Sequence, residues 1–388
     1  MGTQPLQAEI RALKILQVLP SLESGGVEKG TLEISSAIIH AGHQSYVMSA
    51  GGRLVSELEQ SGTTHIEWNI GKKSLLNLFQ VKKIRRWLQR EQFDIVHVRS
   101  RMPAWVIWLA WNKMDPTTRP RLVSTVHGMH SVSKYSAIVT CGERVIAVSN
   151  SIQQYVLTNY PSCSPDKVKL IYRGVDASLF PFGYTPEEIW IDRWREQYPQ
   201  TSNKLIVTLP GRLTRLKGHL VFLELIEKLR NNGLEVIGLI VGSEDPKRKQ
   251  YAQEIHQKTE QLGLQNHIIF TGHRSDMREI YANSNLVLSL SNKPESFGRT
   301  VLEALSIGTP VIGYNHGGVA EILDALFPDG AIDMNNTQQL FERTRRILNQ
   351  QHDPIIQNKK FLLSNMKSET LELYAELNST RNTGTNQS

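Results

Sequence analysis

Short apolar runs recur along the chain, and most are followed by a stretch whose apolar positions are spaced for a helix. An uninterrupted apolar run is typical of a strand buried on both faces, as the strands of parallel sheets are. Strands that alternate with helices in this way predict an α/β protein. The predicted strands are residues 14–19, 45–49, 65–70, 94–98, 122–126, 144–148, 204–209, 236–242, 267–271 and 286–290.

The alternation occurs twice, on either side of a segment rich in proline and glycine. This organisation predicts two doubly wound α/β domains that face a cleft and are joined by a linker. We expect an N-terminal domain over residues 1–182 and a C-terminal domain over residues 183–356. Residues 357–388 should form a helix, over 361–377, and a polar tail that is disordered.

Composition narrows the class of protein. The chain has 388 residues, of which 40% are hydrophobic, so each domain can bury a sizeable core. No uncharged apolar run is long enough to cross a membrane, and the first residues lack the apolar core of a signal peptide. The two cysteines, Cys141 and Cys163, are not spaced for a disulfide framework or a metal site. We therefore expect a cytoplasmic protein.

Positive charge is concentrated in the first half of the chain. Residues 1–180 hold 21 Lys and Arg against 13 Asp and Glu, whereas the remainder holds 23 against 24. A nucleic acid, an anionic membrane surface or a phosphorylated acceptor each fits such a surplus. Nucleic acid fits least, because no nucleic-acid-binding motif accompanies the charge, and we expect no nucleic-acid partner.

The surplus is densest between residues 72 and 90, which hold seven basic residues and no acidic one. The spacing predicts an amphipathic helix over residues 75–90. Its polar side carries four basic residues around one aromatic ring, namely Lys82, Lys83, Arg86, Arg90 and Phe79. Two interpretations stay open. The face is either solvated or rests on anionic lipid headgroups, which would place the protein on the inner face of the cytoplasmic membrane.

Two glutamates eight positions apart, Glu295 and Glu303, mark the most distinctive stretch. Gly298 separates a loop that carries the first from a helix that opens near Arg299 and carries the second. The first turn of a helix offers free N–H groups and the positive end of the dipole, which bind anions. Carboxylates are good acceptors for sugar hydroxyls. The stretch therefore predicts a site for a phosphate that carries sugars, and two solvated glutamates are the alternative.

A second candidate site follows the predicted strand 204–209. Arg212 and Lys217 lie beyond that strand and before the next helix. A guanidinium fork and an ammonium point charge together suit a diphosphate. The chain has no Asp-x-Asp motif to hold a metal ion, so two cations in its place predict a metal-independent site. Two solvated cations in a loop are the alternative.

Two further candidates lie at the ends of predicted strands. His127 follows the strand 122–126, and the pair Gly25-Gly26 follows the strand 14–19 and precedes a helix. Ligands of parallel α/β sheets bind at this carboxyl edge. A single histidine or a glycine pair also occurs for structural reasons alone.

These motifs together resemble family 4 of the retaining GT-B glycosyltransferases, over most of the chain. The segment from Lys293 to Gly318 is similar to the E-x7-E motif of that family, and the segment from Pro210 to Gly218 is similar to its Gly-Arg…Lys-Gly segment. The resemblance implies two Rossmann-like domains and a C-terminal helix that crosses back to the first. It also implies a nucleotide-sugar donor, a UDP- or GDP-sugar, and no cofactor or metal.

The resemblance also implies roles for individual residues. Glu295 would contact the donor sugar and Glu303 the ribose, while Arg212 and Lys217 would grip the diphosphate. His127 would contact the donor sugar from the other domain. By the same resemblance, Gly272, His273 and Arg274 would lie against the nucleobase. The remaining positions expected near the donor are Gly25, Gly26, Phe297, Gly298, Arg299, Thr300 and Val301.

The expected activity is transfer of a sugar from a nucleotide sugar to a glycan or lipid-linked acceptor, with retention, in the synthesis of a bacterial surface polysaccharide or lipopolysaccharide. The chain has neither the G-x-G-x-x-G motif of nicotinamide and flavin enzymes nor a P-loop. Two alternatives stay open. One is another enzyme of this fold, such as an epimerase or a phosphorylase, and the other is a catalytically silent scaffold that binds a sugar nucleotide.

Overall fold

The computed structural model describes residues 11–23, 25–71, 79–244 and 249–383. The chain forms two compact units, and each is described below by itself. Unit 1 comprises Met1–Val148, Ile152–Ile171 and Met366–Ser388, and unit 2 comprises Ser149–Ser151 and Tyr172–Asn365.

These divisions differ from the expected domain boundaries at residues 182 and 356. The segment expected to be a linker, around Pro181, Gly183 and Pro186, is bonded to unit 2 by its backbone. The N–H of Gly183 donates to the carbonyl of Ile307, and shortly before the segment the N–H of Val175 donates to the carbonyl of Phe361. The segment belongs to unit 2 because its backbone groups find their partners there.

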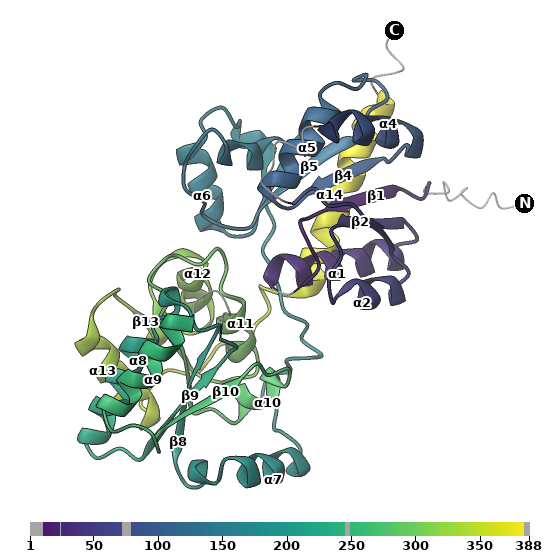
Figure 1. The fold of residues 1–388 in the computed structure, drawn as a ribbon. Helices are drawn as coiled ribbons and strands as arrows, with labels where there is room; N and C mark the ends of the chain where they lie inside the picture. The colour runs from purple at the N-terminus through teal and green to yellow at the C-terminus, as the bar shows by residue number, and fades with distance from the viewer. Residues whose placement is uncertain (1–10, 24, 72–78, 245–248, 384–388) are drawn as a thin grey trace, which may run out of the picture. The chain divides into compact units, whose positions relative to one another are not determined.

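Unit 1 contains a sheet of seven parallel strands in the order β3-β2-β1-β4-β5-β6-β7 (Figure 1). The order reverses between β1 and β4, which makes the sheet doubly wound, as the hydrophobic pattern predicts. The short strand β7 was not expected from that pattern. The strands are β1 (Lys14–Val18), β2 (Gln44–Ser49), β3 (Thr64–Glu67), β4 (Ile95–Val98), β5 (Arg121–Val126), β6 (Arg144–Ala147) and β7 (Val168–Leu170).

Helices connect these strands, and the amphipathic helix predicted over residues 75–90 is present as α4. Its apolar side buries Ile84 and Leu88, while residues 72–78 of the prediction lie outside the described part of the chain. No helix in the described ranges is long and apolar enough to span a membrane. The helices are α1 (Gly26–His40), α2 (Val55–Gln60), α4 (Val81–Glu91), α5 (Arg101–Trp111), α6 (Asn150–Asn159) and α14 (Leu363–Thr383), with 3₁₀ turns η1 (Ser136–Thr140) and η2 (Pro165–Lys167).

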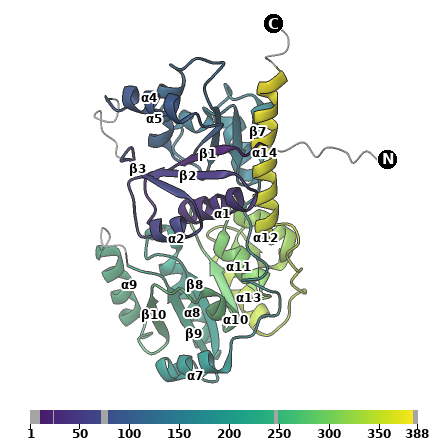
Figure 2. The same cartoon turned by 90° about the vertical axis from the view of Figure 1, so that its right-hand side faces the viewer.

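The C-terminal helix α14 runs along the sheet of unit 1 (Figure 2). Tyr374 of α14 is fully buried, and its hydroxyl oxygen lies 2.6 Å from Nδ1 of His97 in β4. The other ring nitrogen of His97 lies 2.6 Å from the hydroxyl oxygen of Thr125 in β5. Burial lowers the pKa of His97 well below its ordinary value, so the ring is neutral and both nitrogens are hydrogen-bonded. This network anchors the C-terminal helix on unit 1.

Unit 2 contains a second parallel sheet, of six strands, in the order β10-β9-β8-β11-β12-β13. Here the order reverses between β8 and β11, so the second predicted doubly wound sheet is also confirmed. The polar tail expected after residue 377 is helical to Thr383, and residues 384–388 are not described. The strands of unit 2 are β8 (Leu205–Pro210), β9 (Val236–Val241), β10 (Ile268–Gly272), β11 (Leu286–Ser289), β12 (Val311–Tyr314) and β13 (Ala331–Ile332).

A large apolar core joins the sheet of unit 2 to its helices, and a smaller one forms around Trp194. The largest fully buried side chains of the larger core include Phe222 of α8 and Tyr281 of α10. The helices are α7 (Glu188–Gln197), α8 (His219–Asn231), α9 (Lys249–Gln261), α10 (Met277–Ala282), α11 (Arg299–Ser306), α12 (Gly317–Leu326) and α13 (Thr337–Leu348), with 3₁₀ turns η3 (Pro199–Thr201), η4 (Arg215–Lys217) and η6 (Pro328–Gly330).

The anchoring of α14 predicts a stability effect. Tyr374→Phe removes the hydroxyl and leaves a nitrogen of the buried His97 without its partner, which should lower the free energy of unfolding of unit 1 by about 1–3 kcal/mol. Urea unfolding of the two proteins measures the difference. Tyr46→Phe is the matched control, because its hydroxyl makes only a long, 3.4 Å contact with Gln44 at the surface. Equal losses in both variants would show that the buried hydrogen bond adds nothing.

Candidate active site

The two predicted motifs of unit 2 meet at the carboxyl edge of its sheet. Strands β8 and β11 pair directly, and between them the strand order reverses. The loop after β8 carries Arg212 and Lys217, and the loop after β11 carries Glu295. In doubly wound sheets ligands bind outside the carboxyl ends of the strands at such a switch point. The fold therefore places both motifs where a ligand of this sheet is expected.

Lys217 and Glu295 form an ion pair there. The Nζ of Lys217 donates to Oε1 of Glu295 at 2.6 Å, although the two residues are 78 positions apart in the chain. The hydroxyl of Ser291 donates to the same carboxylate oxygen, also at 2.6 Å. The side chains of Lys217 and Glu295 are 30% and 21% exposed, so both charges reach solvent and remain open to a ligand.

The ionisation of Glu295 reflects these partners. Burial acts to raise the pKa of this carboxyl, but the Lys217 ammonium and the Ser291 hydroxyl outweigh it and hold the pKa below its ordinary value. Glu295 is therefore a carboxylate at neutral pH. It can accept hydrogen bonds from hydroxyl groups, and it cannot act as a general acid.

Arg212 is the exposed member of the first motif. It follows Gly211 directly after β8, and it has no hydrogen-bond partner among the residues that the structure describes. An exposed guanidinium at the edge of a sheet is free to bind an anion through two parallel N–H donors. Lys217 is held by a carboxylate and Arg212 is not, so the two predicted cations differ in their availability.

The helix α11 opens at Arg299, as the sequence predicts. Its N-cap is Gly298, whose φ of 101° is a left-handed conformation that side chains disfavour, and a Cβ there would lie 2.7 Å from Cγ2 of Val319. The first N–H groups of a helix find no acceptor in a preceding turn, and with the helix dipole they make its opening favourable for an anion. The opening of α11 follows the loop that carries Glu295.

Glu303 lies one turn into α11 and is only 7% exposed. Its carboxylate accepts from Nε of Arg299 at 2.9 Å and from the hydroxyl of Tyr281 at 3.4 Å. Burial raises the pKa of Tyr281 well above its ordinary value, with Glu303 adding to the effect, so the hydroxyl remains a donor. Glu303 is therefore paired with Arg299, and its expected contact with a ribose stays a prediction.

A second helix, α12, opens onto the same loop. The N–H of Gly318 donates to the backbone carbonyl of Glu295 at 2.9 Å. A Cβ on Gly318 would lie 2.3 Å from Cα of Phe297, so only glycine allows the helix to approach this closely. The N-cap residue His316 has its Nε2 3.0 Å from the carbonyl of Ser291. Two helix openings thus converge on residues 295–297.

The residues expected near the base follow β10, at the edge of the sheet next to β9. Gly272 and His273 lie at the carboxyl end of that strand, and His273 is exposed. Arg274 is instead held by Asp276, with Nε and Nη2 donating to its two carboxylate oxygens at 2.8 and 2.6 Å. The prediction that these positions face a base stays a prediction, and Arg274 already has a partner within its own loop.

The candidates of unit 1 also lie at the carboxyl edge of their sheet. His127 directly follows β5 and is half-buried. Gly25 is the N-cap of α1, after β1, and Gly26 is the first residue of that helix. The expected contact of His127 and the two glycines with a donor bound in unit 2 stays a prediction.

Several partners in the site could not be found from the sequence. No sequence motif marks Ser291 as a partner of Glu295, Tyr281 as a partner of Glu303, or His316 as a partner of the Ser291 carbonyl. Serine and tyrosine are common, and only the pairing of strands and helices brings them to Glu295 and Glu303. In the described ranges, no group of three or more His, Cys, Asp or Glu side chains is placed to hold a metal ion.

Two family models match separate parts of the chain. Residues 24–179 match the model described as "Glycosyltransferase Family 4", and residues 191–361 match "Glycosyl transferases group 1". Spore coat protein SA of Bacillus subtilis is 27% identical over 279 residues, which are 67% of this chain and 70% of that protein.

Solved structures extend the likeness to the whole chain. A glycosyltransferase from Rickettsia africae is 30% identical, with a TM-score of 0.80 over 95% of this chain and 99% of that chain. Anabaena HepE, solved with UDP and glucose, is 22% identical, with a TM-score of 0.79 over 94% of this chain and 100% of that chain. The identity to the second is too low to show more than the shared fold. Together with the two family models, these likenesses show that the chain belongs to family 4 of the glycosyltransferases and has their GT-B fold of two Rossmann-like domains.

Proposed function

We propose that the protein is a retaining glycosyltransferase whose unit 2 binds a nucleotide sugar. The observation that carries the proposal is the Lys217–Glu295 pair beside the openings of α11 and α12. A cation and two helix openings suit a diphosphate, and a carboxylate beside them suits the hydroxyls of the attached sugar. The Anabaena neighbour was solved with UDP and glucose, which supports a UDP-sugar as the donor.

The chemical problem in this reaction is the charge that grows on the leaving diphosphate as the sugar bond breaks. Arg212, Lys217 and the N–H groups that open α11 supply positive charge where that diphosphate would lie. Fixed donors of this kind stabilise a transition state because they need no reorganisation. We propose that they replace a metal ion, and that Glu295 orients the donor sugar while Glu303 holds the ribose.

We place the acceptor on unit 1, and we propose a glycan or a lipid-linked glycan of a bacterial surface polysaccharide or lipopolysaccharide. The surplus of Lys and Arg in the first half of the chain suits a phosphorylated acceptor. His127, at the carboxyl edge of that unit, would contact the donor sugar once a closed state excludes water. We assign Glu295 to sugar binding and not to nucleophilic attack, because hydrogen bonds from Lys217 and Ser291 hold its carboxylate in a fixed position.

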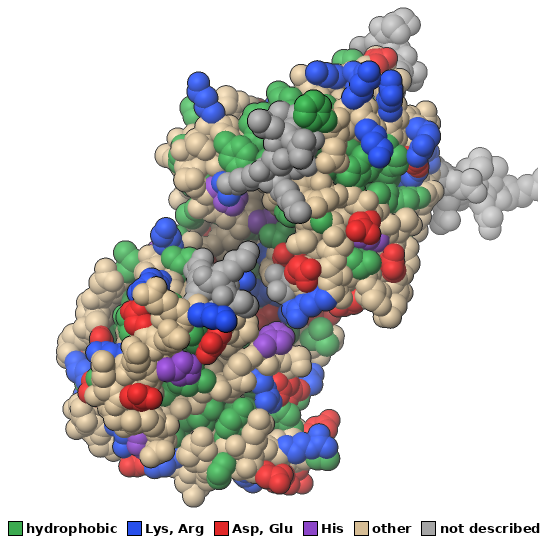
Figure 3. Space-filling model, in the orientation of Figure 1, with side chains coloured by type: hydrophobic (Ala, Val, Ile, Leu, Met, Phe, Trp, Pro, Cys, Tyr) green, Lys and Arg blue, Asp and Glu red, His purple; other side chains and the backbone are tan. Residues whose placement is uncertain are grey.

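We also propose an anionic membrane surface as a partner, through residues 72–90, of which the structure describes 79–90. Phe79, which is 80% exposed, and four basic residues of α4, Lys82, Lys83, Arg86 and Arg90, share one side of the helix by their spacing. Figure 3 shows Lys and Arg side chains gathered on the part of unit 1 that carries α4. Basic side chains beside an exposed aromatic ring are typical of helices that lie on anionic bilayers.

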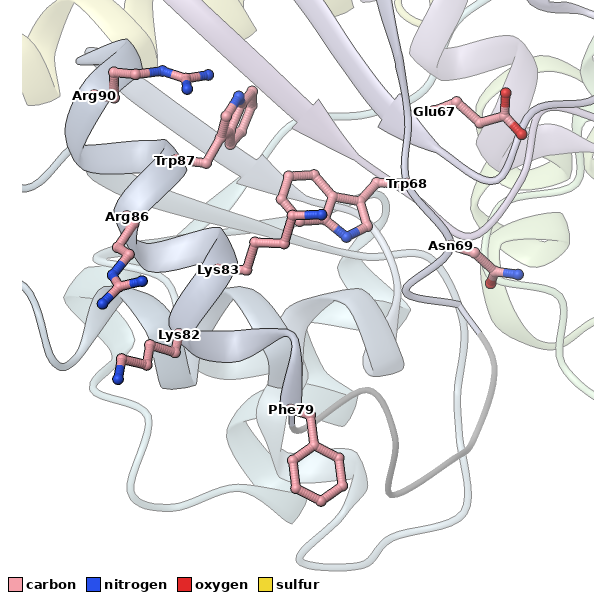
Figure 4. A pocket seen from close by; sticks show the side chains of 9 residues that line it. All are labelled: Glu67, Trp68, Asn69, Phe79, Lys82, Lys83, Arg86, Trp87 and Arg90. Carbon is pink, nitrogen blue, oxygen red and sulfur yellow. The ribbon is translucent and has the colours of Figure 1, made fainter.

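A pocket of about 900 Å³ adjoins this helix (Figure 4). Trp68 and Trp87 meet edge to face in it, with centroids 5.7 Å apart, and the Lys83 ammonium lies 5.3 Å from the Trp68 ring. A lipid phosphate would find cations there and an apolar wall. We propose that this pocket receives headgroups when the protein rests on the inner face of the cytoplasmic membrane.

Loss of the diphosphate contacts should slow transfer. Lys217→Ala should lower kcat by about 10²–10³, the scale for one preorganised electrostatic contact. Arg212→Lys should also transfer poorly, because an ammonium cannot reproduce a bidentate fork. Initial rates with a UDP-sugar donor, with and without EDTA, measure both effects, and wild-type activity should persist in EDTA.

The matched control for these variants is Lys204→Ala. It also breaks a Lys–Glu ion pair, with Glu235, but at the amino end of β8, and its rate should equal that of the wild type. A strict need for Mg²⁺ or Mn²⁺ would overturn the metal-independent mechanism. So would a Lys217→Ala enzyme that works within about threefold of the wild type, where a loss of 10² is expected. A protein that binds the donor and never hydrolyses or transfers it would favour the scaffold alternative.

His127→Ala should keep donor affinity and lose transfer. The residue lies in unit 1, so it should contribute after the donor has bound to unit 2. Calorimetric titration with UDP measures the binding step, and the initial rate measures transfer. His40→Ala, an exposed histidine at the end of α1, is the control. Normal turnover in the His127 variant would assign that residue a structural role.

Membrane binding should depend on α4. The protein should co-sediment with phosphatidylglycerol vesicles at low salt, less at high salt and not with phosphatidylcholine, because surface charges are screened. Changing Lys82, Lys83 and Arg86 to Glu should abolish the binding. The same change at three exposed lysines outside α4, Lys134, Lys167 and Lys169, should reduce it far less. Absence of binding at low salt, or equal losses in both triple variants, would leave the helix face merely solvated.

A further inference from the structure

The chain leaves unit 2 for residues 152–171 of unit 1 and then returns. The residues on both sides of that segment hydrogen-bond to one carboxylate, that of Glu321. Residues 149–151 enter that segment and Tyr172 follows it, and both belong to unit 2. Glu321 lies in α12, the helix whose opening contacts residues 295–297, called the donor loop below. None of the candidate motifs includes Glu321, so it has no assigned part in the reaction.

The contacts of Glu321 are close and numerous. Its Oε1 accepts from the N–H of Ser151 at 2.7 Å and from the hydroxyl of that residue at 2.6 Å. Its Oε2 accepts from the N–H of Asn150 at 2.9 Å and from the hydroxyl of Tyr172 at 3.1 Å. Asn150 also donates its side-chain N–H to the Tyr172 hydroxyl at 2.7 Å.

The carboxylate of Glu321 lies at the opening of a helix and accepts hydrogen bonds there. Asn150 and Ser151 are the first residues of α6, whose opening N–H groups have no partners within the helix. A negative charge at that end also interacts well with the helix dipole. Glu321 therefore caps α6 from a different helix, and it does so at the point where the chain passes into unit 1.

Aromatic packing also holds Tyr172, a partner of Glu321. The ring of Tyr172 meets Phe361 edge to face, with centroids 5.0 Å apart, and the N–H of Val175 donates to the Phe361 carbonyl. Phe361 precedes the residues at which the chain returns to unit 1, after Asn365. All the passages of the chain between the units are thus attached to unit 2 around Glu321 and Tyr172.

This anchor is connected to the donor loop. The hydroxyl of Ser149 donates to the carbonyl of Ser296 at 2.6 Å, next to Glu295. The opening of α12 holds the carbonyl of Glu295 through Gly318, three residues before Glu321. A ligand that shifts residues 295–297 would therefore act on Ser149 and on the opening of α12, the two contacts through which this loop is connected to the segment that leads into unit 1.

We propose that Glu321 is a positioning residue for transfer, which holds the passages of the chain into unit 1 and couples them to the occupied donor loop. The inference rests on the proposed function, since it assumes that the acceptor is presented by unit 1. Glu321 itself touches neither donor nor acceptor in this scheme. Its loss should disturb the step that needs both units and spare the step that needs unit 2 alone.

Glu321→Gln tests the proposal with little change of shape. The amide cannot accept from all four donors, so kcat should fall by about tenfold or more, the scale for hydrogen bonds to a charged group. The Kd for UDP and the KM for the donor should stay within about threefold of the wild type, because the donor contacts are intact. Asp324→Asn, an exposed charge loss on the same helix, should change none of these values.

Two measurements without substrate separate this inference from the proposed function. Amides of residues 150–154 should exchange hydrogen about tenfold faster in Glu321→Gln, and small-angle X-ray scattering should show a broader distribution of interatomic distances. If Glu321→Gln folds poorly, Tyr172→Phe provides the second variant: it removes one of the four donors to Glu321 and the acceptor of the Asn150 side chain, and should give the same pattern at a smaller size.

The outcomes are distinct. Parallel losses of donor affinity and kcat would overturn the inference, because Glu321 would then act through the donor site alone. Faster exchange with an unchanged scattering profile and an unchanged kcat would also overturn it, leaving only a helix cap. A wild-type protein that binds no nucleotide sugar would defeat the proposed function, while exchange and scattering would still decide whether Glu321 is the anchor.

Discussion

The loop between β11 and α11 is held by polar contacts to separate segments of unit 2, and the site depends on them. The carbonyl of Glu295 accepts from Gly318 and its carboxylate accepts from Lys217. The next carbonyl, of Ser296, accepts from Ser149. Polar groups in such a position must be paired, so each contact fixes the loop against another element. The loop after β8, the opening of α12 and the passage into unit 1 are thereby set relative to the same two residues, Glu295 and Ser296.

Because the loop is fixed in this way, hydrogen-bond donors and an acceptor can lie together at one edge of the sheet. Two helix openings point their N–H groups toward the same region, and alone they would only attract anions. Glu295 adds an acceptor for hydroxyl groups, and its pairing with Lys217 keeps it ionised despite burial. In the function we propose, a phosphate would meet the donors of this loop and a sugar would meet its acceptor.

The fold and the positions of the main motifs follow from the sequence, for physical reasons. Buried strands of a parallel sheet are continuous apolar runs, so their ends are visible in the pattern of residues. The carboxyl ends of such strands meet at one edge, which places Arg212, Lys217, Glu295 and His127 at their sheet edges without further information. Gly298 likewise marks the start of α11, because a left-handed residue ends the loop before it.

Tertiary structure alone decided which groups are partners and where the units divide. The sequence offers Lys217 and Glu295 as separate candidates, and only the pairing of β8 with β11 joins them. No pattern in the sequence marks Ser291 or Glu321 as a partner of the groups that it contacts, since contacts between elements depend on packing and not on periodicity. The linker expected near residue 183 has its backbone bonded to unit 2, so the division falls after Ile171. Local pattern determines what each segment becomes, and the satisfaction of polar groups across segments determines which residues act together.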